Sequence, residues 1–277
     1  MDEFTEFERA AWEAKAERFA ATWGSVTSQS IPFVLSKCRI GQGSRVLDIG
    51  CGTGDFAAAA VTHGASVVAI DASSKMCAIT REKVREARVL ESDAEHPPVE
   101  DIEFDAVTLN YLLLHVSDQA LALKEAARAV KVGGVLAWTN WIAPAESHGM
   151  RLIFSALSEF ADFSVIPPAQ DIFLLSNPSV ANEILGALGF RQVETMIIPT
   201  EWRVSSGSEF FEALQAGSRI GGLLELQVPE VRERLRTRIV SEAEKGSVSA
   251  ASPDSKKEGQ SIAIPMPSHL FTAVRDS

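Results

Sequence analysis

Apolar and polar positions along the chain predict helices at the start and alternating strands and helices after residue 43. In the first 37 residues, "EFERAAWEAKAERFAATW" spaces apolar side chains among charges at helical intervals, and "SIPFVLSK" predicts a further short helix. From Gly43, apolar runs typical of buried strands alternate with amphipathic segments. The predicted strands are "SRVLDIG", "SVVAID", "ARVLESD", "FDAVTLNYLLLH" and "VLAWTNW". Strands separated by helices form parallel sheets that are covered on both faces, so we expect an α/β, doubly wound core.

This alternation lapses after Pro144. Residues 147–180 predict a helix and an aromatic loop, and "VANEILGALGF" predicts a further helix. Residues 208–245 predict two charged helices broken near Pro229, and "RQVETMIIPTEWRV" and "SIAIPMPSHLFTAVRD" each predict one strand. Residues 244–260 contain few large apolar side chains, so we expect a mobile loop there.

Composition and charge narrow the classes of function. With 277 residues, 46% of them hydrophobic, the chain can build one large core, and we expect a single domain over residues 1–277. A net charge of −11 disfavours nucleic acid as a substrate. No run is long enough to span a membrane, and the start "MDEFTEFERA" is acidic where a signal peptide is basic, so we expect a cytoplasmic protein. The histidines and cysteines lack the spacing of metal ligands, so we expect no metal.

The stretch "VLDIGCGTGDF" places a glycine-rich turn between a predicted strand and a predicted helix. Such a turn lets a ligand approach the backbone closely, and the helix beyond it offers unpaired N–H groups. Gly50, Gly52 and Gly54 give G-x-G-x-G, whereas a dinucleotide-binding loop uses G-x-G-x-x-G. Asp48 stands two residues before the first glycine, where its charge would repel a pyrophosphate but suit a ligand with an ammonium group.

Two further carboxylates stand where predicted strands end. Asp71 is placed to accept hydrogen bonds from both hydroxyls of a ribose, and Asp93 from the exocyclic amine of an adenine. Either residue could instead cap a helix. A ligand with a cation, a ribose and an adenine, and without phosphates, matches S-adenosylmethionine.

Five successive motifs resemble those of the class I S-adenosylmethionine-dependent methyltransferases in order and spacing. They are "VLDIGCGTGDF", "VVAIDASSKM", "ESDAEHPP", "FDAVTLNYLLLH" and "RAVKVGGVLA". The ends of the chain are similar to a branch near the ubiquinone and menaquinone biosynthesis C-methyltransferases. The resemblance implies a seven-stranded, mostly parallel, Rossmann-like sheet whose last strand, Ser261 to Val274, is antiparallel. It also implies a cofactor-binding core at residues 43–142 and a helical lid from residues 1–37, 147–180 and 203–250.

The same resemblance implies which residues bind the cofactor. The glycines would contact the methionine part of S-adenosylmethionine, Asn110 would offer its carbonyl to the ammonium, and Met76 would lie against the adenine. The complete cofactor set is Asp48, Gly50, Gly52, Gly54, Asp71, Ala72, Met76, Asp93, Ala94 and Asn110.

Aromatic residues concentrate in the predicted lid, which favours a pocket for an apolar or aromatic acceptor, although aromatic residues are usually core. The candidate substrate-binding residues are Trp12, Phe19, Trp23, Trp141, Phe154, Phe173 and Trp202. Two residues are candidates for catalysis. Tyr111, the only tyrosine, could orient an acceptor through its hydroxyl, and His115 could act as a base or could make only a structural hydrogen bond.

These features predict an enzyme that transfers a methyl group from S-adenosylmethionine, in line, to a small-molecule acceptor. The acceptor would be a natural product or a quinone-like compound that is methylated on O, N, S or C, and the product of the cofactor would be S-adenosylhomocysteine. The alternatives are a protein of the same fold that catalyses a cyclisation, and a non-catalytic binding protein. The acceptor and the oligomeric state stay open.

Overall fold

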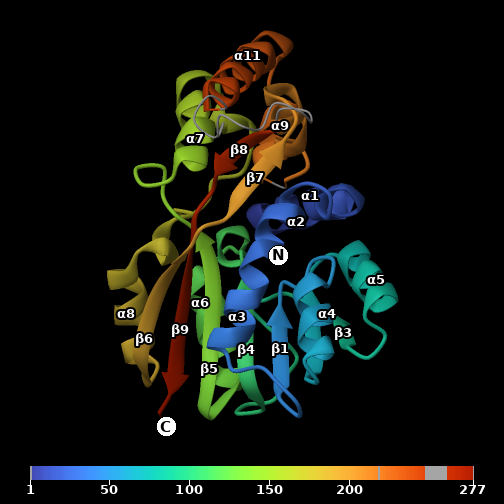
Figure 1. The fold of residues 1–277 in the computed structure, drawn as a ribbon, viewed down its shortest axis with the longest axis vertical. Helices are drawn as coiled ribbons and strands as arrows, with labels where there is room; N and C mark the ends of the chain where they lie inside the picture. The colour runs from blue at the N-terminus through green and yellow to red at the C-terminus, as the bar shows by residue number, and fades with distance from the viewer. Residues whose placement is uncertain (1, 218, 247–260, 277) are drawn as a thin grey trace, which may run out of the picture.

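A seven-stranded sheet runs through the lower half of the molecule in the computed structural model, which describes residues 2–217, 219–246 and 261–276 (Figure 1). The strand order is β3-β2-β1-β4-β5-β9-β6. Strands β1 to β5 pair in parallel, whereas β9 is antiparallel to both β5 and β6. The predicted α/β fold with a mostly parallel sheet is therefore confirmed. The strands are β1 (Arg45–Ile49), β2 (Ser66–Asp71), β3 (Arg88–Glu91), β4 (Phe104–Asn110), β5 (Val130–Trp141), β6 (Phe190–Ile198) and β9 (Ser268–Arg275).

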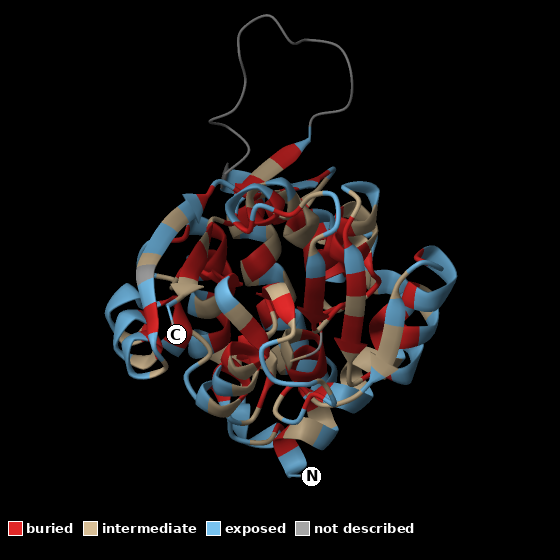
Figure 2. Ribbon diagram, turned by 90° about the horizontal axis from the view of Figure 1, so that it is seen from below, coloured by how far each residue is buried: buried red, intermediate tan, exposed pale blue. Residues whose placement is uncertain are grey.

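Helices cover both faces of this sheet because its central strands are apolar on both sides. Along β5, Val135 and Ala137 pack in one apolar cluster with α3 and α4, whereas Leu136 and Trp138 pack in another with α6 and α8. Figure 2 shows the strands as a buried centre within a largely exposed rim. The helices around the sheet are α3 (Ile31–Lys37), α4 (Asp55–Thr62), α5 (Ser74–Lys83), α6 (Gln119–Ala129) and α8 (Pro178–Ala187).

A second layer, which we call the cap, lies over the carboxyl ends of the parallel strands and has its own apolar cluster, which includes Trp23, Met150 and Phe210 (Figure 1). The cap contains α1 (Glu3–Phe19), α2 (Trp23–Thr27), α7 (His148–Phe160), α9 (Gly207–Leu214), α10 (Arg219–Leu226), α11 (Pro229–Gly246) and an antiparallel pair of strands, β7 (Glu201–Val204) and β8 (Ile262–Pro265). Short 3-10 helices complete the described elements: η1 (Ser28–Ser30), η2 (Leu113–His115), η3 (Phe163–Val165) and η4 (Leu174–Ser176).

Three segments differ from the predicted elements. "RQVETMIIPTEWRV" forms two strands in different sheets, β6 and β7, which are separated at Pro199. "SIAIPMPSHLFTAVRD" likewise forms β8 and β9 around Pro265 and Pro267, so the antiparallel strand of the main sheet begins at Ser268. Proline has no N–H and interrupts a ladder of strand hydrogen bonds. Between residues 208 and 245, the part that the structure describes contains three helices, because α9 and α10 are separate.

Most of the predicted lid lies in the cap. Residues 31–37 instead form α3, which packs against the sheet, and residues 178–180 begin α8. Residues 244–246 of the expected mobile loop are the last turn of α11, and the rest of that loop lies outside the described residues.

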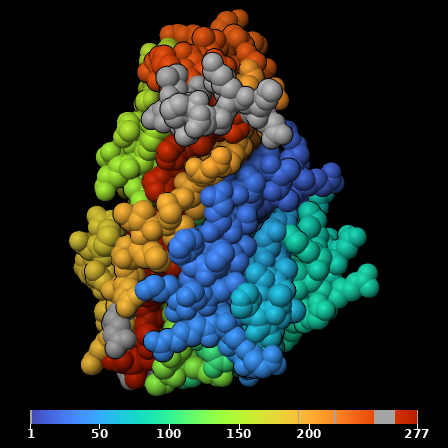
Figure 3. Space-filling model, in the orientation of Figure 1, coloured from blue at the N-terminus to red at the C-terminus, as the bar shows by residue number. Residues whose placement is uncertain are grey.

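Glu13 is one of the residues that fasten helix α1 to the core. Glu13 accepts hydrogen bonds from Ser73 Oγ at 2.6 Å, Ser74 Oγ at 2.8 Å and the backbone N–H of Lys75 at 3.2 Å. These donors lie at the start of α5, where helix N–H groups have no partner within the helix. The bond from Ser73 contributes most to lowering the pKa of Glu13. Figure 3 shows the N-terminal segment, in blue, lying across the molecule between the core and the cap.

Candidate functional site

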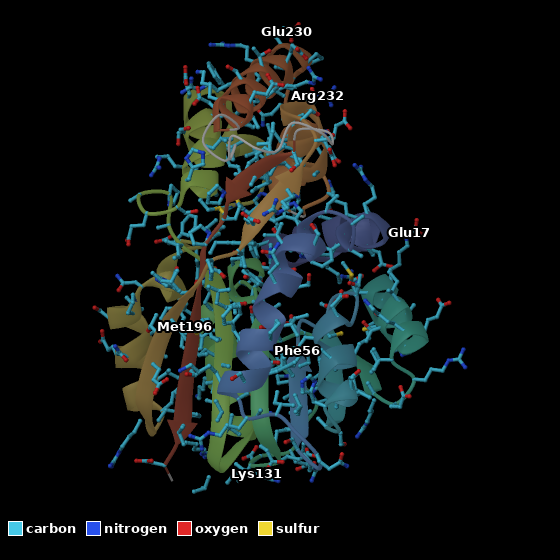
Figure 4. All side chains as sticks on the ribbon, viewed as in Figure 1. Glu17, Phe56, Lys131, Met196, Glu230 and Arg232 are labelled. Carbon is cyan, nitrogen blue, oxygen red and sulfur yellow. The ribbon has the colours of Figure 1, made fainter. Side chains whose placement is uncertain are left out.

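A cavity lies between the carboxyl edge of the sheet and the cap. Its walls include the ends of β1, β2, β4 and β5, the loop after β3, and parts of α1, α2, α7 and α10. Ligands of open α/β sheets bind at this edge, where the strand order reverses, and here β1 lies between β2 and β4. The opposite edge, marked by Lys131 in Figure 4, carries an ion pair of 3.0 Å between Lys131 and Asp105.

The glycine loop after β1 forms the floor of this cavity. Gly50 and Gly52 line it, and both have left-handed backbones, with φ of 73° and 53°. A Cβ at Gly50 would lie 2.7 Å from a methyl carbon of Leu112, whereas a Cβ at Gly52 would meet only Phe19, at 3.8 Å. Gly54, with φ of 77°, turns the chain into α4 and does not line the cavity. The backbone at Gly52 is thus open to a ligand.

Asp71 holds the glycine loop from the end of β2. Its Oδ2 accepts the N–H of Gly52 and its Oδ1 accepts the N–H of Ser73, both at 2.9 Å. Burial raises the pKa of this carboxyl above its usual value, while the two N–H groups oppose that shift. The cap of α5 is Ser73, whose Oγ accepts the N–H of Met76, so the alternative role of Asp71 as the helix cap does not hold.

Residues after β2 and β3 form the wall beside Asp71. Asp93 accepts the N–H of Glu95 at 2.9 Å within the loop after β3, so it does not cap a helix there. Met76 and Ala94 are buried apolar groups that line the cavity, and Ala72 lines it as well. The arrangement offers a carboxylate on each of two neighbouring strand ends with an apolar surface nearby.

Buried polar groups at the other side of the glycine loop have unmet hydrogen-bonding capacity. Asp48 Oδ1 accepts from Thr108 Oγ1 at 3.3 Å, but its Oδ2 has no partner among the described residues. Burial, helped by the nearby Asp71, raises the pKa of Asp48 to about 7. Asp48 lies beneath the cavity wall rather than in it. The amide of Asn110 does line the cavity, and neither its Oδ1 nor its Nδ2 has a partner in the described part of the chain. Orphaned buried polar groups of this kind suit a ligand with an ammonium group.

His115, the candidate base, meets a carboxylate from the cap. Its Nδ1 lies 2.8 Å from Oε2 of Glu8 on α1, and both residues line the cavity. The ring of Trp12 stands edge-on to the imidazole, with 5.0 Å between ring centroids. Arg219 of α10 reaches the other oxygen of Glu8 at 4.0 Å. The histidine is therefore held by a residue that lies 107 positions earlier in the chain.

The sequence did not point to Glu8 or Arg219. The sequence did contain a signal for Glu8, because Thr5, Glu8 and Trp12 are spaced to lie on one face of a helix, and all three line the cavity. Arg219 gave no signal, since nothing in the local pattern of α10 distinguishes it from the other charged residues nearby.

Tyr111, the other catalytic candidate, presents its ring to the cavity and its hydroxyl to a buried polar cluster. The hydroxyl lies 2.8 Å from Oγ of Ser268, and burial raises the pKa of this phenol to about 12. It therefore stays protonated near neutral pH. The ring packs against Trp141 with 4.4 Å between centroids. The backbone of Tyr111 has a φ of 51°, which is uncommon for a residue other than glycine.

The predicted aromatic set is largely brought together around the cavity. Those that line it are Trp12, Phe19, Trp23, Trp141, Phe154 and Phe173. Trp202 is the exception and corrects the expectation of a direct substrate contact. It is buried behind Trp23, at 4.8 Å between ring centroids, and is not part of the cavity wall. Strand β7, which carries Trp202, turns this side chain into the apolar cluster of the cap.

Two further properties concern the described residues alone. No group of three or more His, Cys, Asp or Glu side chains lies together in them as a metal site would require. Their helices are all too short or too polar to cross a lipid bilayer.

Comparison with known proteins identifies the core. Residues 47–138 match the family model described as a methyltransferase domain. The demethylmenaquinone methyltransferase of Staphylococcus saprophyticus is 34% identical over 109 residues, which cover 37% of this chain and 47% of that relative. The ubiquinone/menaquinone biosynthesis C-methyltransferase of Haemophilus ducreyi is 32% identical over 152 residues, which cover 50% of this chain and 56% of that relative. The chain thus spans about half the length of the curated relatives that it matches.

Solved structures share the fold at low sequence identity. An S-adenosylmethionine-dependent methyltransferase of Thermotoga maritima has a TM-score of 0.55 at 17% identity, with 97% of this chain and 99% of that chain covered. The [4+2]-cyclase SpnF has a TM-score of 0.53 at 21% identity, with 92% and 83% covered. A phosphoethanolamine N-methyltransferase of Haemonchus contortus, in complex with S-adenosylhomocysteine, has a TM-score of 0.52 at 20% identity, with 90% and 53% covered. Residues 47–138 of the chain thus carry a methyltransferase domain, and the curated relatives of the chain include quinone biosynthesis C-methyltransferases.

Proposed function

We propose that this protein transfers a methyl group from S-adenosylmethionine to an apolar or aromatic small-molecule acceptor. The observation that carries the proposal is the half-buried carboxylate of Asp71, which is held by the N–H groups of Gly52 and Ser73 beside an open glycine loop. Bound S-adenosylmethionine supplies an electrophilic methyl group on a positively charged sulfur. The chain's own residues would bind the cofactor and the acceptor, orient them, and exclude water from the site.

The amino acid part of the cofactor fits the orphaned polar groups of the site. Asp48 would attract the ammonium from beneath the glycine loop, and Asn110 would offer it a carbonyl oxygen. Both residues have a hydrogen-bonding oxygen that no described residue uses. Gly50 and Gly52 would admit the methionine chain, because neither presents a side chain to the cavity. Gly54 would act indirectly, by shaping the turn into α4.

The nucleoside part fits the wall after β2 and β3. Each oxygen of Asp71 accepts one N–H and keeps a further lone pair for a ribose hydroxyl. Asp93 would accept from the adenine amine, and Met76 and Ala94 would cover the ring, with Ala72 beside the ribose. The product S-adenosylhomocysteine would occupy the same site.

Catalysis would come mainly from position. Holding the acceptor atom about 3 to 3.5 Å from the methyl carbon, in line with the sulfur, supplies much of the acceleration that such a transfer needs. The apolar walls from Trp12, Trp141 and Phe154 would keep water away from the reacting atoms. The named activities of the curated relatives support a quinone-like ring compound as the acceptor, and the aromatic walls suit a planar ring.

His115 is the candidate base for an acceptor that arrives protonated. The hydrogen bond to the carboxylate of Glu8 would fix the orientation of the imidazole. Tyr111 would contribute its ring to the acceptor pocket, because its hydroxyl is already engaged by Ser268.

Formation of S-adenosylhomocysteine separates this proposal from its alternatives. The protein is incubated with methyl-labelled S-adenosylmethionine and a panel of phenols and hydroquinones. A methyltransferase accumulates S-adenosylhomocysteine together with a labelled acceptor. A cyclase of this fold, or a binding protein, leaves the cofactor unconsumed.

Asp71→Ala tests the cofactor site. Removing a charged acceptor from paired hydroxyls costs about 1 to 3 kcal/mol, so the Kd of S-adenosylhomocysteine should rise by about fivefold to 150-fold in calorimetric titration. Glu91→Gln is the control, because Glu91 is the register neighbour of Asp71 on β3 but is exposed and outside the cavity wall. An unchanged Kd in Asp71→Ala would contradict the ribose assignment.

Gly52→Val and Gly43→Val form a matched pair for the glycine loop. Both positions have left-handed backbones, so each variant carries a similar strain of about 1 to 2 kcal/mol. Only Gly52 lines the cavity, and nothing lies within 4 Å of a Cβ at Gly43. We expect Gly52→Val to abolish binding of S-adenosylhomocysteine and Gly43→Val to retain it. Binding that survives in both variants would mean that the loop is only a turn.

The buried carboxyl of Asp48 predicts a pH-dependent affinity. Its pKa is raised to about 7 in the free protein, and a neighbouring ammonium would favour the ionised form and lower that pKa. Binding of S-adenosylhomocysteine should therefore release a proton and tighten as the pH rises through 7. Calorimetry in buffers of different ionisation enthalpy measures both effects, and Asp48→Asn should remove them. The range from pH 6 to 8 spans about one unit on either side of that pKa. A Kd that does not change over this range would place the ammonium elsewhere.

His115→Ala tests the base. If the imidazole takes a proton from the acceptor, kcat should fall by about 100-fold or more, and the loss should ease as the pH rises and the acceptor ionises by itself. His63→Ala is the control, since His63 is exposed, lies outside the cavity wall, and its ring bonds the carbonyl of Ala59 in α4. A His115→Ala enzyme with nearly full activity would mean that transfer proceeds by positioning alone.

A further inference from the structure

Trp23 carries a buried hydrogen-bond donor that no described residue satisfies. It lies at the start of α2, is 7% exposed and lines the cavity. Its indole Nε1 has no hydrogen-bond partner in the described part of the chain. A buried N–H that lacks a partner destabilises the folded state, so such a group calls for an explanation.

The indole is held firmly in this position by other rings. Trp141 stands edge-on to it at 5.9 Å between centroids, and Trp202 lies behind it at 4.8 Å. Because Trp202 itself packs against Phe210 at 5.2 Å, Trp23 has a rigid support on the side away from the cavity. The direction of the N–H is thus set by packing, as in a preorganised binding site.

The residue next to this N–H is a glycine. A Cβ at Gly217 would lie 2.6 Å from Nε1 of Trp23 and 3.0 Å from Cε2, too close for any other amino acid without a shift of the ring. Gly217 also lines the cavity. Glycine at this position therefore lets the backbone lie against the indole edge without displacing the ring.

Trp23 lies on the acceptor side of the cavity. The orphaned groups assigned to the cofactor, Asp48 and Asn110, belong to β1 and β4 of the core, whereas Trp23 belongs to the cap. The rings of Tyr111 and Trp141 pack together and line the cavity wall next to Trp23. The indole N–H therefore belongs to the part of the cavity in which the proposed acceptor would bind.

We infer that the indole N–H of Trp23 donates a hydrogen bond to an oxygen of the acceptor, which is an apolar ring compound carrying a carbonyl, hydroxyl or ether oxygen. This inference rests on the proposed function, since it names the chemical class of the acceptor. An indole N–H is a donor only, so it selects for a lone pair. A protonated amine has none and is disfavoured beside it.

Two model compounds test the inference directly. 1-Tetralone and tetralin share one bicyclic skeleton, and only the first has a carbonyl oxygen. Binding of each is measured in the presence of saturating S-adenosylhomocysteine, by the indole N–H signals of the five tryptophans in ¹⁵N-labelled protein. Trp23→Phe identifies the signal of Trp23. We expect 1-tetralone to move this signal downfield, and tetralin to lack that downfield shift.

Variants separate the hydrogen bond from simple packing. In Trp23→Phe the Kd of 1-tetralone should rise by about threefold to tenfold, because one neutral hydrogen bond is lost. The Kd of tetralin should change by less than about twofold. Gly217→Ala should act in the same direction, because the new Cβ displaces the indole. Trp138→Phe is the control, since Trp138 lies outside the cavity wall and stacks on Phe271 rather than on Trp23.

The inference is overturned if the wild-type protein binds both compounds equally, if neither compound binds at millimolar concentration, or if Trp23→Phe weakens both to the same extent. Failure of the proposed function has a different signature. In that case S-adenosylhomocysteine itself does not bind, whatever the two ring compounds do.

Discussion

The hydrogen bond from the backbone of Gly52 to the carboxylate of Asp71 ties together the two strand ends that form the proposed cofactor side of the cavity. It joins the loop after β1 to the end of β2, and the second oxygen of Asp71 extends the connection to Ser73 at the cap of α5. Burial of a carboxylate is costly unless it is hydrogen-bonded, and these two N–H groups meet that need. A left-handed glycine at position 52 is what brings the donor within reach.

The two halves of the cavity meet at neighbouring residues. Asn110 ends β4 and has an unpaired amide on the proposed cofactor side. The next residue, Tyr111, has a positive φ and places its ring against Trp141 on the proposed acceptor side. Glu13 then secures α1 across the edge of the sheet through the start of α5. In the proposed assignment, core elements therefore set the distance between cofactor and acceptor, and the cap lies over them.

Much of the core could be predicted because its signals are local. The apolar run of β1 leads into the glycine loop, β2 ends at Asp71 and β4 ends at Asn110. Parallel strands bring their carboxyl ends to one edge of the sheet, so these residues could be expected together. The direction of each carboxylate then follows from its position at the end of a strand.

The cap could not be predicted to the same degree, because its contacts are distant in sequence. Glu8 meets His115 across 107 positions, and the pairing of β7 with β8 joins segments on either side of three helices. Trp202 has the same aromatic character as Trp23, yet only the fold decides that it supports the ring rather than lines the cavity. We predicted one strand across Pro199 and one across Pro267, and neither the breaks at these prolines nor the resulting change of sheet was predicted.

The central claim is that the carboxylates at this edge select a cationic nucleoside without phosphates. Equilibrium titration of the protein with S-adenosylhomocysteine, followed by competition with ATP, tests that claim most directly. The account predicts one molecule of S-adenosylhomocysteine bound per chain and no displacement by ATP, because Asp48 and Asp71 repel phosphates placed on the glycine loop. Binding of ATP together with no binding of S-adenosylhomocysteine would contradict it.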